Sequence, residues 1–225
     1  MLACVGALSG ALQAAIAAAP DPRPSALVAE MQSGFGAGHV RVELKGGALF
    51  YQSERARTAR IVPSERQWRE FRRALDDLGV WSWRSRYERN VTDAASWSLE
   101  IAYADRSVKT GGYAAGPGKA YKRYEYALQR LLGDRMLGGR LVGKLEVFEL
   151  EELRLVAAHP SPRAAQSWVE IRDPSGRTYR ARVGDFIGPD YGKLEEVTAR
   201  SIRLKELVID RDGDWVERTT TMEIR

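Results

Sequence analysis

The chain has 225 residues, of which 44% are hydrophobic and 29% are charged, and this ordinary globular composition excludes an intrinsically disordered protein, a collagen and a polytopic membrane protein. A single cysteine, Cys4, excludes an internal disulfide, and with only two histidines, His39 and His159, far apart in the sequence, it also excludes zinc sites built from Cys and His. The 9 prolines and 21 glycines indicate many turns, which favours a β-rich or α+β chain over a helical bundle.

Residues 1–19 carry no charge and consist mostly of Ala, Leu, Val and Gly, a composition typical of an export or anchor segment. We therefore assign residues 1–38 to a signal or anchor segment followed by a linker. Two interpretations stay open: cleavage after the small residues at 15–19, or lipidation of Cys4 as the tail of a bacterial lipobox. Both place the rest of the chain outside the cytoplasm, where a lone thiol that is removed or acylated is compatible with an oxidising compartment.

Residues 39–135 alternate between two kinds of hydrophobic periodicity. Period two over residues 40–51 and again over residues 97–110 predicts two hairpins. Period 3.6 over residues 64–79 and 121–133 predicts two amphipathic helices, each ending at a glycine. The order ββαββα indicates a small α+β domain, with both helices on one face of an antiparallel sheet.

The positive charge lies mainly in the first two thirds of the chain. Residues 1–147 carry 22 Lys and Arg against 15 Asp and Glu, whereas residues 148–225 carry 13 against 15. Interleaved arginines and aromatic rings are typical of single-stranded nucleic acid binding, but they also fit a solvated helix face above core tryptophans, and we favour the second interpretation. The residues concerned are Arg66, Arg69, Arg72, Arg73, Arg84, Arg86 and Arg89 with Trp81, Trp83 and Tyr87.

Short strands without an intervening helix fill residues 145–225, and this pattern predicts an all-β unit, a small β-sandwich. In register, the segment resembles the C-terminal domain of the type IV pilus assembly protein family PilP. The motifs that carry the resemblance are Leu145–Leu150, Leu153–Val156, Arg172–Gly176, Val183–Lys193, Leu204–Val208 and Asp214–Arg218.

Several residues of these motifs have a structural explanation. Gly184 and Asp185 suit a tight turn, and Gly188 and Gly192 suit positive φ where the strand doubles back. Trp215 is large enough to fill a small sandwich core.

The resemblance implies a non-enzymatic scaffold protein of the periplasm, associated with the bacterial inner membrane, which needs no cofactor and no metal. PilP proteins couple the inner-membrane proteins PilN and PilO to the periplasmic modules of the secretin PilQ. In the similar type II secretion protein GspC the first β-strand contacts the secretin, which here implies Leu153, Leu155 and Ala157 as partner-binding residues. A GspC-like secretin-docking protein and an envelope protein that binds single-stranded DNA during uptake remain the alternatives, and the folded basic module before residue 145 departs from the family pattern.

Overall fold

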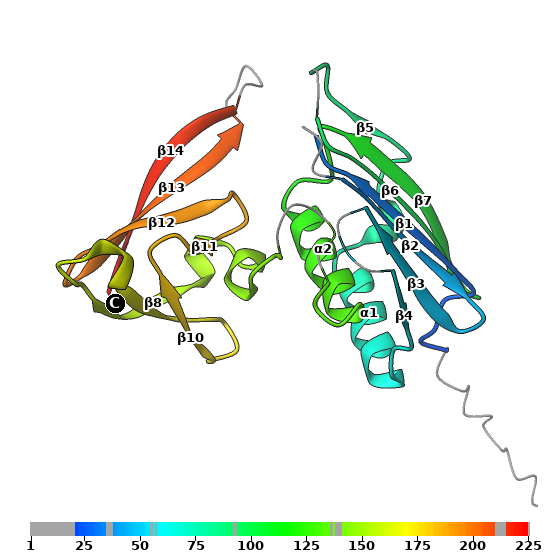
Figure 1. Cartoon of the computed structure of the whole chain (residues 1–225), viewed down its shortest axis with the longest axis horizontal. Coiled ribbons are helices and arrows are strands. Elements are labelled where there is room, and N and C mark those ends of the chain that lie inside the picture. Colours follow the sequence, from blue (N-terminus) through cyan, green and yellow to red (C-terminus); the bar gives the residue numbers. More distant parts are fainter. Residues whose placement is uncertain are drawn as a thin grey trace, which may run out of the picture.

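The structure is a computed structural model that describes residues 21–34, 38–54, 56, 58–91, 94–135, 137, 141–209 and 215–224, without the side chains of Leu207, Ile209 and Trp215. The buried hydrophobic side chains gather in two clusters. One lies between Leu27 and Leu137, and the other begins at Leu145 and includes the last strand through Met222. The helices and strands that carry the two clusters form two units, which lie side by side in Figure 1.

In the described residues, the first unit is built on a seven-stranded sheet with the strand order β4-β3-β2-β1-β6-β7-β5. Its neighbouring strands are antiparallel except for β5 and β7, which are parallel. Alternate residues are buried, as in β1, where Leu27, Ala29 and Met31 face the core. The strands are β1 (Ala26–Gln32), β2 (His39–Lys45), β3 (Ala48–Ser53), β4 (Ala59–Ile61), β5 (Tyr87–Glu88), β6 (Ser96–Ala102) and β7 (Ser107–Tyr113).

Two helices, α1 (Glu65–Asp77) and α2 (Lys119–Leu131), cover one face of this sheet (Figure 1). Helix α1 begins with a capping box, in which Ser64 accepts from the backbone of Gln67 while the Gln67 side chain accepts from the backbone of Ser64. Its apolar stripe of Trp68, Phe71 and Leu75 is buried against the sheet, which explains the 3.6-residue period of the sequence.

The expected order ββαββα is incomplete. The structure adds β1, β4 and β5, and β1 is the middle strand of the sheet although the sequence analysis placed it in the linker. It pairs with β2 on one side and with β6 on the other. In the sequence, residues 26–32 follow directly on the proline-rich stretch at 20–25, which favours a linker, whereas pairing with β2 and β6 makes them a central strand.

The second unit contains a three-stranded sheet, in the order β10-β9-β8, and a four-stranded sheet, in the order β11-β12-β13-β14. Leu155, Val169 and Ile171 of the first sheet pack with Leu194 and Leu204 of the second in one core, which is consistent with the expected small β-sandwich. The elements of the second unit are η3 (Lys144–Val147), η4 (Leu150–Glu152), β8 (Arg154–His159), η5 (Ala164–Gln166), β9 (Trp168–Arg172), β10 (Thr178–Arg182), β11 (Phe186–Ile187), β12 (Gly192–Val197), β13 (Ser201–Ile209) and β14 (Trp215–Glu223). The first unit also contains a short 3-10 helix, η2 (Val80–Ser82).

The predicted signal or anchor segment, with Cys4, lies outside the described residues. Among the residues that the structure does describe, none of the helices combines the length and the hydrophobicity that crossing a bilayer requires.

Candidate functional site: the open edge and outer face of the three-stranded sheet

Strand β8 forms an edge of the three-stranded sheet, because β9 pairs with it on one side only. On its other side the described residues provide one isolated β-bridge, a parallel one between Leu155 and Ile224. A β-bulge follows, since Leu155 pairs with Ile171 while Ala157 pairs with Glu170. Beyond the bulge the backbone of residues 157–159 borders an edge at which another strand can add.

The bulge separates the three residues that the resemblance implied for partner binding. Leu153 is 5% exposed and Leu155 is 1% exposed, and both pack in the sandwich core. Ala157 instead faces outward with Glu170, because the extra residue Val156 interrupts the period-two alternation. Leu153 and Leu155 therefore cannot present side chains to a partner in this fold, and the strand itself is shifted to Arg154–His159.

The outer face of the three-stranded sheet is strongly basic. We call it the arginine face, and it consists of the outward side chains of β8, β9 and β10. In these strands Arg154 pairs in register with Arg172, His159 with Trp168 and Arg180 with Glu170. The residues of this face are Arg154, Ala157, His159, Trp168, Glu170, Arg172, Thr178, Arg180 and Arg182.

Trp168 is the centre of a stack on this face. The His159 ring lies parallel to it with 3.7 Å between the ring centroids, and the Arg180 guanidinium carbon lies 3.9 Å from the Trp168 ring centroid. Next to the stack, a pocket of about 330 Å³ is lined by Trp168, Arg180 and Arg182 together with Ala165 and Gln166 of η5. The pocket thus brings two guanidinium groups to one surface depression.

The turn between β10 and β12 is built by glycines in two different ways. Gly184 and Gly188 have φ of 100° and 79°, the left-handed region that favours glycine. Asp185 closes the turn by accepting the backbone N–H of Arg182 at 2.8 Å. Gly192 differs from the expectation, because its φ is not positive; a Cβ there would lie 2.3 Å from the carbonyl oxygen of Ile187, so close backbone approach requires glycine. The side chain of Trp215 lies outside the described residues.

Three of the sequence motifs meet at Arg218 of β14. Its guanidinium lies 2.9 Å from the carboxylate of Glu206, whose side chain is 1% exposed, and 3.5 Å from Asp190 in the β11–β12 turn. Thr220 also donates to Glu206. Burial raises the pKa of Asp190, while the nearby cations Lys119 and Arg218 oppose that rise. This cluster was not predictable from the sequence, because the three segments are far apart in the chain.

Comparison with known proteins identifies this unit. The family model described as Pilus assembly protein, PilP, matches residues 139–224. These residues are a PilP domain. A curated relative, the type IV pilus inner membrane component PilP of Pseudomonas aeruginosa, is 30% identical over 81 residues, which are 36% of this chain and 45% of the relative. The resemblance seen in the sequence is therefore confirmed for the C-terminal unit, while the chain spans a little under half of that relative's length.

Solved PilP structures match the same share of the chain. The solution structure of PilP from Pseudomonas aeruginosa is 26% identical with a TM-score of 0.33, over 37% of this chain and 72% of that one. The solution structure of a domain from the Neisseria meningitidis PilP pilot protein is 32% identical with a TM-score of 0.32, over 40% of this chain and 78% of that one.

The PilP domain contacts helix α2 of the first unit through charged side chains. Lys119 pairs with Glu149 and lies 4.0 Å from Asp190, and Arg123 lies 3.2 Å from Glu152. The hydrogen bond to Glu149 raises the pKa of Lys119 against the lowering effect of burial. We call these contacts the α2 junction. Helix α2 opens with the cations Lys119, Lys122 and Arg123, but their partners lie some thirty residues away and were not predictable from the sequence.

Four of the seven arginines in the basic set of the first unit, Arg66, Arg69, Arg72 and Arg86, form ion pairs with carboxylates. Arg66 pairs with Glu70 and Arg69 with Glu65 along α1, while the Arg72 side chain, 11% exposed, is held by Asp76 and Asp105. Trp81 and Trp83 pack against the core. The alternative of single-stranded DNA binding therefore gains no support from this geometry.

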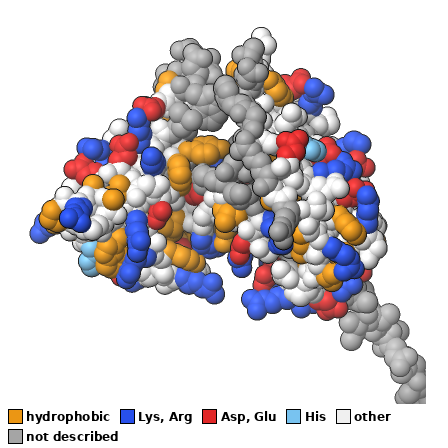
Figure 2. Space-filling view, viewed as in Figure 1, with side chains coloured by type: hydrophobic (Ala, Val, Ile, Leu, Met, Phe, Trp, Pro, Cys, Tyr) orange, Lys and Arg blue, Asp and Glu red, His pale blue; other side chains and the backbone are white. Residues whose placement is uncertain are grey.

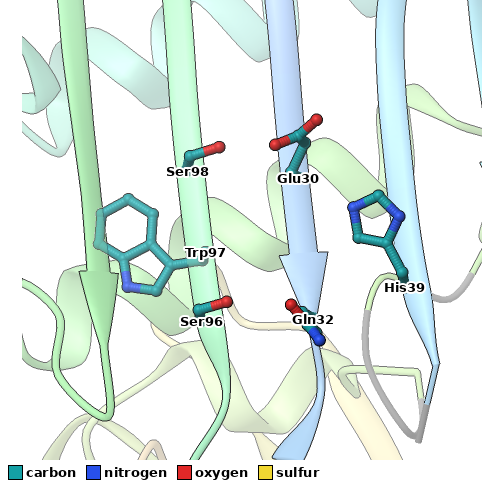
Figure 3. Close-up of a pocket in the computed structure, with 6 residues that line it drawn as sticks. All are labelled: Glu30, Gln32, His39, Ser96, Trp97 and Ser98. Carbon is teal, nitrogen blue, oxygen red and sulfur yellow. The ribbon is translucent and has the colours of Figure 1, made fainter.

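A second depression, of about 160 Å³, lies on the outer face of the seven-stranded sheet and is shown in Figure 3. Figure 3 shows Glu30 and Ser98 on the adjacent strands β1 and β6, with His39 on β2 beyond them. Within the described residues the hydrogen bonds of His39 are made by its backbone, whose N–H donates to the Glu54 carboxylate at 3.1 Å and whose carbonyl oxygen accepts from the Glu54 N–H at 3.2 Å. A Ser-His pair is thus not formed here, and the depression does not support nucleophilic catalysis. The lining residues are Glu30, Gln32, His39, Ser96, Trp97 and Ser98.

Proposed function

We propose that this protein is a non-enzymatic scaffold subunit of a type IV pilus assembly machine. The observation that carries the proposal is the PilP domain over residues 139–224, together with the open β8 edge in that domain. The curated relative is named an inner membrane component of the type IV pilus, and one solved relative is described as a type IV pilus biogenesis lipoprotein. We extend both the machine and the inner-membrane association to this chain, with the folded units on the periplasmic side.

In the proposed arrangement the PilP domain docks on the periplasmic modules of a PilQ-like outer-membrane secretin through the β8 edge. A strand that adds to an edge gains backbone hydrogen bonds, and alternate side chains give specificity. Leu153 and Leu155 shape the strand from inside the core, while Ala157, which is small and faces outward, leaves room for the partner. The contact is therefore with the backbone of residues 157–159 and the outward side chains beside it.

The first unit then acts as the adaptor toward PilN-like and PilO-like alignment proteins of the inner membrane. It is held to the PilP domain by the α2 junction, so that a partner bound to either unit is placed relative to the other. The same docking geometry would serve a GspC-like subunit of a secretion machine, which is the second candidate, and both candidates predict secretin binding at β8.

Photo-cross-linking with the full-length chain tests the docking site. A photo-reactive amino acid replaces Ala157, and a matched control replaces Thr219, which is exposed on β14 of the other sheet. With the periplasmic modules of the secretin from the same bacterium, we expect a cross-link from position 157 and none from position 219. Cross-linking from 219 alone, or from neither position, would refute the proposal; both substitutions avoid the core, so loss of folding is not a competing explanation.

A further inference from the structure

The arginines of the arginine face form no ion pair within the part of the chain that the structure describes, although Glu170 lies opposite Arg180 in the strand register. Among the described residues, none of Arg154, Arg172, Arg180 and Arg182 takes part in an ion pair, and all four are exposed. On the opposite sheet Arg203 pairs with Glu196 at 2.7 Å and Lys205 with Glu217 at 2.7 Å, whereas Lys193 of β12 has no ion pair among the described residues. Among the strands of the PilP domain, unpaired positive charge is thus concentrated on the sheet that carries the β8 edge. Figure 2 shows Lys and Arg side chains at the lower left, where Figure 1 places β8 and β10.

The contacts of Trp168, and the lack of exposed large hydrophobic side chains beside it in the described part of the chain, argue against two classes of partner for the arginine face, nucleic acids and lipid bilayers. The indole is already contacted by the His159 ring and by the Arg180 guanidinium, so it is not free to stack on a nucleic-acid base. The face also carries no exposed large hydrophobic side chain that would insert into a bilayer, since the exposed ones of the described residues lie elsewhere, at Val62, Val91, Leu141, Tyr191, Val216 and Ile224. A protein surface that supplies carboxylates fits the face better than either.

We propose that the arginine face binds an acidic surface of the secretin module that docks on β8, with one carboxylate side chain entering the pocket between Arg180 and Arg182. This inference rests on the proposed function and names the chemistry of the partner. A guanidinium is suited to carboxylates because its planar donors match both carboxylate oxygens. A strand added beside Ala157 lies at the β8 edge of the arginine face, and a module that continues from this strand over the outer face of β9 reaches Arg180 and Arg182 on β10.

Binding affinity as a function of salt and charge tests the inference. The full-length chain is titrated with the secretin periplasmic modules in about 50 mM and about 500 mM NaCl, where the Debye length falls severalfold. We expect the affinity to fall about tenfold over this range and to fall about ten- to hundredfold for the double variant Arg180→Glu, Arg182→Glu. The matched control is Lys193→Glu with Arg200→Glu, the same charge change at exposed positions around β12, and it should keep the wild-type affinity. Equal melting temperatures establish that all variants fold.

The outcomes separate this inference from the function on which it rests. Absence of wild-type binding refutes both. Wild-type binding that neither salt nor the Arg180/Arg182 variant weakens leaves secretin docking intact and overturns the acidic partner. Phosphatidylglycerol vesicles and a single-stranded oligonucleotide are titrated in parallel, and if the variant loses affinity for either of these while its secretin affinity is unchanged, the face belongs to that ligand and the inference is wrong.

Discussion

The ammonium group of Lys122 lies 3.7 Å from the ring centroid of Tyr191, and the two residues belong to different units of the chain. Tyr191 has φ of 55°, a left-handed conformation that costs a residue other than glycine about 1 kcal/mol or more. The Lys122 side chain is 9% exposed, so the ring covers a largely desolvated cation. The turn between β11 and β12, which belongs to the motif Val183–Lys193 of the PilP domain, therefore packs on helix α2 of the first unit.

The ion pairs around this contact predict that charge reversal on α2 releases the two units from each other. In the double variant Lys119→Glu, Arg123→Glu, like charges oppose Glu149 and Glu152. Each unit has its own core, so both should stay folded. Spin labels at exposed positions 73 and 193, in a chain without Cys4, should give one narrow distance distribution in the wild type and a broad one in the variant.

The control for this experiment is Arg66→Glu with Lys109→Glu, which makes the same change of charge at ion pairs away from the junction. Its distance distribution should match the wild type. An equally narrow distribution in the junction variant would show that the charged contacts do not hold the units together.

Arg218 predicts a second, stabilising role for the motif residues. Removing it in Arg218→Met leaves the buried Glu206 with Thr220 as its remaining side-chain donor among the described residues, and an unsatisfied buried acceptor costs about 1–3 kcal/mol. Adding Glu206→Gln removes the buried charge, so the double variant should recover part of the loss. Urea denaturation measures both. A double variant less stable than Arg218→Met would contradict the assignment of Glu206 as a buried carboxylate that depends on Arg218.

The fold was predictable from the sequence where periodicity is local and uninterrupted. The stripe of Trp68, Phe71 and Leu75 with its capping serine gave α1, and the in-order motifs gave the PilP domain. Features that depend on pairing between distant segments were not predictable. The central position of β1 depends on pairing with β6, some seventy residues away, and the inward direction of Leu155 relative to Ala157 depends on a bulge that only the pairing with β9 defines.

The candidate site was likewise predictable from the sequence only in part. The resemblance implied a segment that the structure shows as part of an edge strand, β8, but two of the three side chains that it implied face the core. The arginine face escaped notice because Arg154, Arg172 and Arg180 are separated in the chain and meet only through the register of three strands. Separate basic residues carry no pattern until pairing places them on one face.

Because Leu155 is buried, we expect its substitution to change the stability of the PilP domain. Leu155→Ala creates a cavity in the sandwich core and should lower the free energy of unfolding by about 2–5 kcal/mol, and Leu155→Asp should prevent the PilP domain from folding. Ala157→Ser, on the outer face, should change stability by less than about 0.5 kcal/mol. Urea denaturation followed by circular dichroism compares the three. If Leu155→Asp melts like the wild type, Leu155 is not a core residue and its direct role in partner binding is restored.

The contact of Asp105 with Arg72 predicts how the melting temperature of the protein changes with pH. The hydrogen bond that it accepts from Arg72 at 2.7 Å lowers the pKa of its carboxyl from 3.8 to about 2. Because the folded pKa is depressed, the ionised carboxylate stabilises the fold above the unfolded pKa, and this contribution is lost as pH falls toward about 2. Asp105→Asn should therefore melt below the wild type at neutral pH, with a difference that shrinks below about pH 4. Asp77→Asn, exposed on the same helix as Arg72, should show no such difference at any pH. A melting difference for Asp105→Asn that stays constant between neutral pH and about pH 2.5 would mean that the Arg72 contact does not depend on the charge of Asp105.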